Sequence, residues 1–362
     1  LDQQVMERLL RGDTSRGAPA LESLGLTAGQ SLNFFGSSTL STLDSNGKSL
    51  LDKLVLSTPA IYGAGNADDV ALIQTGNLIW SGAPNAAAPV IAQGAGTGSG
   101  TLQVQARRIE FGHGPDTQAD SLGDYGRSTL GFANVNLTAS ERITANHKGS
   151  LAVYQARGAY EAGKGYAHSG GNLTISTPLL TGEAGSVNRI TVGGDLRVNG
   201  NGAANGVAVQ ALGGELLLAA RSIGLDTAVV LPSGKLTLSA EQDIHLGDAA
   251  RLDLAGRTVG LLDEKQYSWG GDVTLQSRHG NIRQGAGAVI DLSAHNNQGG
   301  LLKAVAVEAG AGVIDLQGRI LAGSSGYYDA GGTLVPYKAG GVDIRGQYLG
   351  DFVALNQRLN DG

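Results

Sequence analysis

Short segments in which apolar and polar residues alternate recur along most of the chain. In "GELLLAARSIGL" (214–225) and "GKLTLSAEQDIHL" (234–246), a glycine precedes apolar residues at every second position, then a small residue and a second apolar pair. A period of two is typical of β-strands, whose successive side chains point to opposite faces. The pattern therefore predicts short strands, each with one face buried.

The same pattern repeats at a nearly constant interval. Further copies begin at Gly100 ("GTLQVQARRIEF"), Gly171, Gly194 and Gly271, with looser copies at 30–36, 52–63 and 133–144. From Gly171 the glycines follow one another after 23, 20, 20 and 37 residues. A recurring unit of about 20–25 residues indicates a solenoid. The longest gap contains "LDEKQYSWGG" (262–271), which we interpret as an insertion.

The pattern also selects the kind of solenoid. Each unit holds two or three short apolar pairs, such as Leu216 with Leu218 and Ile223 with Leu225, and leaves no room for a helix of about 10–12 residues. The L-x-x-L-x-L-x-x-N pattern of leucine-rich repeats is missing. Small residues, including Ala220 and Ala240, follow the first strand where the chain must bend. We therefore predict an all-β fold, a right-handed parallel β-helix with short loop insertions, over residues 21–350.

The two ends of the chain differ from the repeats. "LDQQVMERLL" (1–10) has apolar residues at helical spacing, so residues 1–20 are expected to form a helical cap or a linker. The alternative is that this helix belongs to a preceding segment. Residues 351–362 form the C-terminal end segment, which we expect to cap the last strands in the same way. Caps are needed because a bare strand edge promotes aggregation.

The composition of the chain limits the classes of partner that it can bind. Of 362 residues 58 are glycine and 41% are hydrophobic, which is enough for a continuous core. The net charge is −6 and the basic residues do not cluster, so we expect no nucleic-acid partner. No apolar run approaches the ~20 residues of a membrane helix, so we expect no membrane span. The chain begins without Met or a signal sequence, and we expect it to be an internal piece of a longer protein.

The chain contains no cysteine. Disulfides, thiolate catalysis and cysteine-based zinc sites are therefore excluded. A cysteine-free chain of this length fits export in an unfolded state, in which a premature disulfide would obstruct passage through a pore.

The lines "GKLTLSAEQDIHLG" and "GNLTIST" resemble the filamentous-haemagglutinin family, the large exoproteins of two-partner secretion systems in Gram-negative bacteria. The resemblance covers most of residues 20–320. It implies secretion through a dedicated outer-membrane β-barrel transporter partner, location at the bacterial cell surface or outside it, and a role as an adhesin or biofilm-matrix fibre in virulence. The Asn-Pro-Asn motif of the family's secretion domain is absent, which implies a fibre segment or a later module.

A second class of function competes with the adhesin interpretation. Polygalacturonase-like β-helix enzymes carry N-x-D, D-D, G-H-G and R-I-K motifs, and this chain holds partial matches at "NADD" (66–69), "GHG" (112–114) and "RIT" (142–144). However, His113 follows Asp69 by about two rungs, or roughly 10 Å, which is too far for hydrogen bonding. Thr144 replaces the family's lysine. We therefore favour surface turns, and expect no catalytic residue and no cofactor.

Two further motifs allow a binding interpretation. The segment 111–128 places acidic residues four apart, a spacing that would suit Ca²⁺, but the known calcium-loop patterns are absent and we favour a polar surface loop. The tripeptide Arg11–Gly12–Asp13 matches an integrin-binding motif, although Gly12 also fits a helix C-terminal cap.

Aromatic residues are scarce, so their positions carry information. They amount to 5% of the chain, and exposed rings beside polar groups are typical of sugar-binding surfaces. Packing of loops against the β-helix is the alternative role for these rings. The candidate ligand-binding residues, for a polysaccharide or a host-surface ligand, are Trp80, Tyr267, Trp269, Tyr327 and Tyr328.

Overall fold

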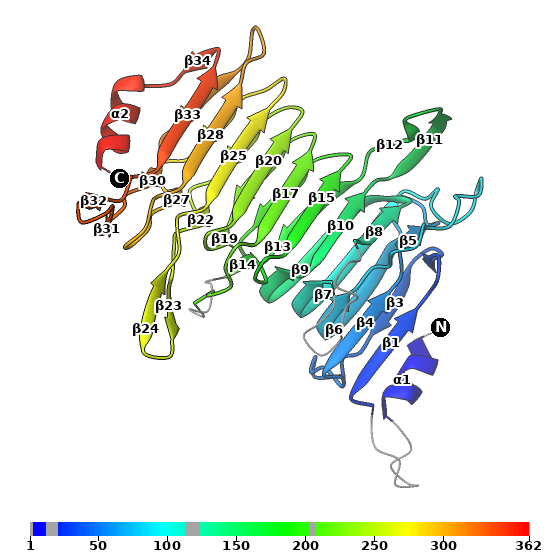
Figure 1. Cartoon of the computed structure of the whole chain (residues 1–362). Coiled ribbons are helices and arrows are strands. Elements are labelled where there is room, and N and C mark those ends of the chain that lie inside the picture. Colours follow the sequence, from blue (N-terminus) through cyan, green and yellow to red (C-terminus); the bar gives the residue numbers. More distant parts are fainter. Residues whose placement is uncertain (1–2, 12–20, 113–123, 203–207, 362) are drawn as a thin grey trace. The chain divides into compact units, whose positions relative to one another are not determined.

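The computed structural model describes residues 3–11, 21–112, 124–202 and 208–361. Strands make up 54% of the chain and helices 5%, and long sheets of many parallel strands dominate (Figure 1). No sheet is closed among the described residues. The predicted all-β parallel β-helix is confirmed.

Two compact units divide the chain. Unit 1 comprises Leu1–Thr177 with Arg189–Leu196, and unit 2 comprises Pro178–Asn188 with Arg197–Gly362. The boundaries fall between Thr177 and Pro178, within β15 (Val187–Val192) and within β16 (Leu196–Asn199).

Unit 2 is built from rungs of three strands, and the strands of successive rungs pair in parallel. The first strands of the rungs are β17 (Glu215–Ala220), β20 (Lys235–Ala240), β25 (Asp272–Ser277), β28 (Leu301–Ala306) and β33 (Gly341–Gly346). The second strands are β18 (Ile223–Asp226), β21 (Ile244–Leu246), β26 (Ile282–Gln284), β29 (Val313–Leu316) and β34 (Tyr348–Leu349). The third strands are β14 (Leu179–Gly182), β19 (Ala228–Val230), β22 (Arg251–Asp253), β27 (Val289–Asp291) and β30 (Arg319–Leu321).

The alternating apolar residues of these strands form inward-facing columns. Ile223, Ile244, Ile282 and Ile314 are partners in register and are at most 2% exposed. Columns of this kind bury the apolar side of each rung against the rungs on either side, which no rung achieves alone.

The glycine that opens each repeat has a steric role. A Cβ on Gly234 would overlap the carbonyl oxygen of Gly214, and the same relationship links Gly271 to Gly234 and Gly300 to Gly271. None of these four glycines has a positive φ. Close approach of the backbones therefore requires glycine here, and not the left-handed conformation to which glycine is suited elsewhere.

Unit 1 has longer strands. One run of parallel pairs consists of β1 (Ser23–Thr27), β4 (Lys53–Ser57), β6 (Val70–Trp80), β7 (Gly100–Phe111), β9 (Phe132–Ala145) and β13 (Asn172–Ser176), with β3 (Ser38–Ser41) also pairing with β6. A second run consists of β2 (Leu32–Phe34), β5 (Ala60–Gly63), β8 (Tyr125–Leu130) and β10 (Lys148–Val153).

Each unit has a helix on a terminal rung. In unit 1, α1 (Gln3–Arg11) buries Met6 and Leu10 with Leu51, and the side-chain amide of Gln3 hydrogen-bonds to the backbone of Ser41 on β3. In unit 2, α2 (Phe352–Asp361) buries Leu355, and Arg358 Nη2 donates to the carbonyl of Leu316 on β29 at 2.6 Å. The predicted N-terminal helix is confirmed, and the C-terminal segment is also helical.

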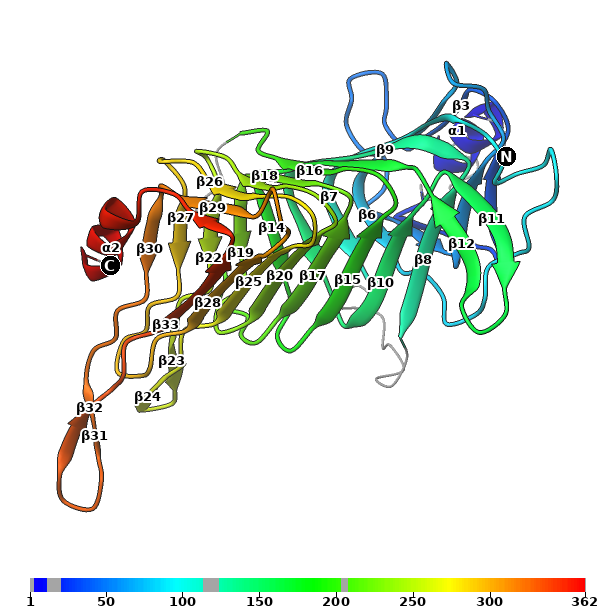
Figure 2. The same cartoon turned by 90° about the horizontal axis from the view of Figure 1, so that it is seen from above.

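In the part of the chain that the structure describes, three antiparallel hairpins project from the rungs. Unit 1 carries β11 (Ala156–Glu161) with β12 (Gly165–Ser169). Unit 2 carries β23 (Thr258–Leu261) with β24 (Glu264–Tyr267), and β31 (Tyr327–Asp329) with β32 (Leu334–Pro336). Figures 1 and 2 show both hairpins of unit 2 on the same side of that unit. The predicted insertion at 262–271 corresponds to β23–β24, which begins slightly earlier.

Candidate ligand-binding surface

Three consecutive loops of unit 2 leave the β-helix at one corner. They follow β22, β27 and β30, which are adjacent strands in register, and they span residues 254–271, 292–300 and 322–340. Because neighbouring parallel strands lie about 4.8 Å apart, loops that leave their ends emerge side by side. We call the aromatic and polar residues of these loops the corner surface: Tyr267, Trp269, His295, Asn296, Ser325, Tyr327, Tyr328 and Tyr337.

The first two loops are joined by hydrogen bonds and a ring contact. Asn297 Nδ2 donates to the carbonyl of Tyr267 at 2.8 Å, and the amide of Gly270 donates to the carbonyl of Gln298 at 3.0 Å. The rings of Tyr267 and His295 meet edge-on, with centroids 5.4 Å apart. These contacts fix the position of the Tyr267 ring relative to the second loop.

His295 joins the second loop to the third. Its Nδ1 lies 2.7 Å from Ser325 Oγ, and its Nε2 lies 3.1 Å from Asn296 Nδ2. An amide NH₂ only donates, so Nε2 accepts, and Nδ1 therefore carries the proton that is donated to Ser325. Asn296 has a φ of 50°, an uncommon value for a residue with a side chain. These contacts connect the second loop to the third.

Three rings of the corner surface are exposed to solvent. Trp269 is 55% exposed, Tyr327 65% and Tyr328 44%. The ring centroids of Tyr328 and Tyr337 are 5.4 Å apart, and Ser324 Oγ donates to the carbonyl of Tyr337 at 2.8 Å. Rings that are open to solvent are able to pack against the apolar face of a sugar.

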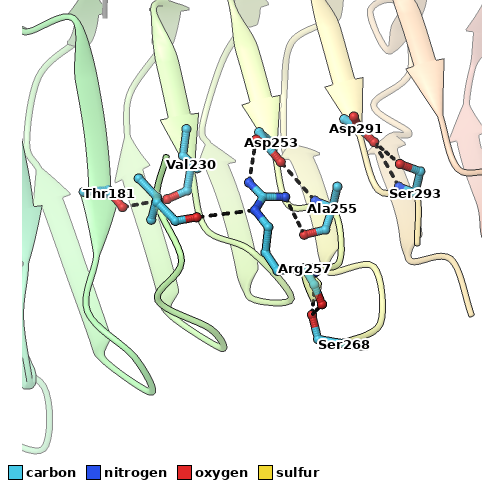
Figure 3. Close-up of polar contacts among 9 residues, drawn as sticks. Thr181, Val230, Asp253, Ala255, Arg257, Ser268, Asp291 and Ser293 are labelled. Carbon is cyan, nitrogen blue, oxygen red and sulfur yellow. Dashed lines mark hydrogen bonds and ion pairs between the residues drawn. The ribbon is translucent and has the colours of Figure 1, made fainter. Parts of the chain in front are cut away.

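Arg257 supports the base of the first loop (Figure 3). Its Nη2 contacts Asp253 Oδ2 at 2.7 Å, its Nη1 donates to the carbonyl of Ala255 at 3.0 Å, and its Nε donates to the carbonyl of Val209 at 3.3 Å. Its side chain is only 18% exposed. The ion pair therefore gains more than a solvated surface pair and ties the loop to β22.

Two serines continue this support to Trp269. The backbone amide of Arg257 donates to Ser268 Oγ at 2.7 Å. Ser233 Oγ lies 2.7 Å from both Ser268 Oγ and the carbonyl oxygen of Trp269. On the next rung, Asp291 occupies the position of Asp253 and accepts from Ser293 Oγ at 2.6 Å instead of from an arginine (Figure 3).

The structure brings most of the predicted aromatic residues together. Tyr267, Trp269, Tyr327 and Tyr328 all lie on the corner surface. The prediction was wrong for Trp80, which is 0% exposed and packs against Phe111 with ring centroids 6.3 Å apart. Trp80 shares the inward phase of Leu78 on β6, so it faces the core.

Of the enzyme motifs, residues 66–69 form a turn, as expected. The expectation of a surface turn is wrong for residues 142–144, which lie on β9 with Ile143 buried in the core. Asp69 accepts hydrogen bonds from Ser37 Oγ at 2.8 Å and from the amide of Asn66 at 2.7 Å. The bond from Ser37, followed by the one from Asn66, lowers the pKa of Asp69. A carboxyl group that is stabilised as the carboxylate is a poor general acid. His113 lies outside the described residues.

Two other sequence candidates fall largely outside the described residues. Of the 113–124 segment only Asp124 is described, and of the Arg11–Asp13 tripeptide only the backbone of Arg11, at the end of α1. Among the described residues, no three His, Asp or Glu side chains are grouped so as to hold a metal ion.

Sequence reasoning missed a second group of aromatic residues. Tyr154, Tyr160, Tyr166 and His168 lie on or beside the β11–β12 hairpin of unit 1, together with Arg157. The signal was available in "ARGAYEAGKGYAHS" (156–169), in which two tyrosines flank a glycine-rich turn.

Comparison of the chain with protein-family models, with curated proteins and with solved structures finds no match. None of the helices in the described residues has the length and apolar character needed to cross a membrane.

Proposed function

We propose that this chain is a segment of a secreted, surface-associated fibre of the filamentous-haemagglutinin type, which acts by binding carbohydrate through the corner surface. Repeated rungs supply the scaffold, and the loops of three successive rungs supply the ligand contacts. The observation that carries the proposal is the exposure of Trp269, Tyr327 and Tyr328 on loops that hydrogen bonds hold together.

The chemistry of the surface favours binding a saccharide. Exposed rings pack against the apolar faces of sugar rings, while neighbouring hydroxyl, amide and imidazole groups hydrogen-bond to sugar hydroxyls. Because Arg257, Ser268 and Ser325 already hold the loops, less conformational entropy is lost on binding. An exported fibre with such a surface would act as an adhesin or a matrix component, and a dedicated outer-membrane transporter would be its secretion partner.

The proposal is tested by titrating the chain with a panel of neutral and acidic oligosaccharides. We expect saturable binding to at least one oligosaccharide, and an affinity about tenfold lower in Trp269→Ala or Tyr327→Ala, because truncation of an aromatic anchor costs more than ~1 kcal/mol. Tyr348→Ala is the matched control, since Tyr348 is also exposed in unit 2 but lies on β34, outside the corner surface. Equal losses in all three variants, or no binding at all, would refute the proposal.

A parallel assay separates binding from catalysis. Incubation of the chain with polygalacturonate, followed by measurement of new reducing ends, distinguishes an adhesin from a β-helix glycosidase. We expect no release of sugar. Release that is abolished by Asp69→Asn would support the enzyme alternative instead.

A further inference from the structure

The β11–β12 hairpin of unit 1 combines a cation with aromatic rings. The guanidinium carbon of Arg157 lies 4.1 Å from the centroid of the Tyr166 ring. The rings of Tyr166 and Tyr160 meet edge-on with centroids 5.1 Å apart, and Tyr160 is 63% exposed. A guanidinium over the face of an aromatic ring is attracted by the ring, and its N–H groups remain able to donate hydrogen bonds.

Arg157 is held in place without a carboxylate partner. Its Nη2 donates to the carbonyl of Val90 at 3.2 Å, and Val90 belongs to a segment that the hydroxyl of Tyr62 anchors through the carbonyl of Ala88 at 2.6 Å. The nearest acid along the hairpin, Glu161, pairs with Lys164 at 2.7 Å. Among the described residues, no Asp or Glu forms an ion pair with Arg157. A guanidinium has five N–H donors, so donors of Arg157 are left to serve a ligand.

A second stack extends the same surface. The rings of Tyr154 and His168 lie 4.7 Å apart and nearly parallel, and Arg157 pairs with His168 across the hairpin. Burial lowers the pKa of His168, and the charge of Arg157 lowers it further. His168 is therefore neutral at pH 7, and Arg157 is the cation of this group.

We propose that the hairpin surface (Tyr154, Arg157, Tyr160, Tyr166 and His168) binds an acidic polysaccharide built of uronic acids. The carboxylate of a uronic acid matches the arginine fork, and the apolar face of its ring matches the exposed tyrosines. A single arginine beside aromatic rings can pair with one carboxylate, which is the number that each uronic acid carries. The net charge of −6 opposes a denser polyanion such as a nucleic acid. This site is separate from the corner surface and does not depend on it.

The test is a titration of the full chain with oligogalacturonate, with a neutral maltooligosaccharide for comparison. We expect oligogalacturonate to bind and the neutral sugar to bind at least about tenfold more weakly, with an affinity for oligogalacturonate that falls as salt is raised. Arg157→Gln is expected to weaken binding about tenfold, and Arg157→Lys less, because lysine keeps the charge and loses the planar fork. The control Lys148→Gln removes an exposed cation from β10 of the same unit and should change affinity less than about twofold.

Two further variants separate binding at the hairpin surface from binding at the corner surface. Tyr160→Ala removes an exposed ring that does not touch Arg157 in the described contacts, and should weaken oligogalacturonate binding without changing the fold. Trp269→Ala should leave it unchanged, because Trp269 belongs to the corner surface. Amide spectra of Arg157→Gln establish whether the hairpin remains folded. Equal affinity in wild type, Arg157→Gln and Lys148→Gln, or equal binding of the acidic and neutral sugars, would overturn the proposal.

Discussion

Gly234 packs so closely against the carbonyl oxygen of Gly214 that no methyl group fits between them. The carbonyl accepts a hydrogen bond from the amide of Lys235 at 2.9 Å, so the two rungs cannot separate without losing a ladder bond. Glycine at positions 234, 271 and 300 is therefore a packing requirement of the stacked backbones.

Gly234→Ala is accordingly expected to destabilise unit 2 by about 2–3 kcal/mol, through overpacking of the backbone. The measurement is the urea midpoint followed by far-UV circular dichroism. Gly224→Ala is the control, because a Cβ on Gly224 of β18 meets nothing within 4 Å. A Gly234→Ala midpoint equal to that of Gly224→Ala would contradict the steric explanation.

The β-helix can be predicted from the sequence, because the alternation of apolar and polar residues is visible within each short segment. The candidate site cannot be predicted in this way, because it depends on where the inserted residues between two rungs leave the β-helix. Alternation at Leu216 and Leu218 is enough to identify an inward-facing strand. Gly234 and Gly271 are 37 residues apart, and nothing in that spacing shows that the inserted residues leave at the same corner as residues 322–340. The alternation that places Leu78 in the core also places Trp80 there, two residues later on β6. The scarcity of aromatic residues, by contrast, does not indicate which of them are exposed.

Arg127 on β8 is a buried cation whose partners are backbone carbonyls. It is 2% exposed, and its guanidinium donates to the carbonyls of Trp80, Ser81, Tyr125 and Ser150 at 2.5–3.2 Å. Burial lowers the pKa of Arg127 to about 10, so it remains charged at pH 7. A lysine has fewer donors, and in a different geometry, so some of these carbonyls would lose their bond from the side chain.

Arg127→Lys should therefore destabilise unit 1 by about 2–3 kcal/mol, measured as the shift in urea midpoint. Arg189→Lys, at an exposed position of β15 in the same unit, provides the matched control and should change stability by less than ~0.5 kcal/mol. Similar midpoints for the two variants would show that the hydrogen bonds from Arg127 to the four carbonyls contribute little to the stability of unit 1.

The stacked imidazole of His168 predicts a pH dependence in unit 1. Burial against Tyr154, followed by the charge of Arg157, lowers the pKa of His168 below 6.5. As the pH falls through 6.5, the unfolded chain binds a proton before the folded chain does, so stability decreases on acidification. Above pH 6.5 both states are neutral and the effect disappears.

A histidine NMR titration checks this directly. The midpoint of His168 should lie below 6.5 in the wild type and should move towards 6.5 in Tyr154→Ala, which removes the covering ring. A wild-type midpoint at or above 6.5 would contradict the assignment of burial as the cause.

Arg257 is expected to control the rigidity of the β23–β24 hairpin without contacting the exposed rings. Arg257→Met removes the bonds to Asp253, Ala255 and Val209 and leaves Asp253 without its cation. Local opening of the hairpin then becomes more frequent, and trypsin cleavage after the exposed Lys265 should accelerate about tenfold, because cleavage of a local segment follows the population of its open form. Arg283→Met, at an exposed position on β26, is the control. Equal cleavage rates in the two variants would mean that Ser233 and Ser268 hold the loop by themselves. Faster cleavage in Arg257→Met with unchanged global stability would show that the ion pair between Arg257 and Asp253 stabilises the hairpin locally.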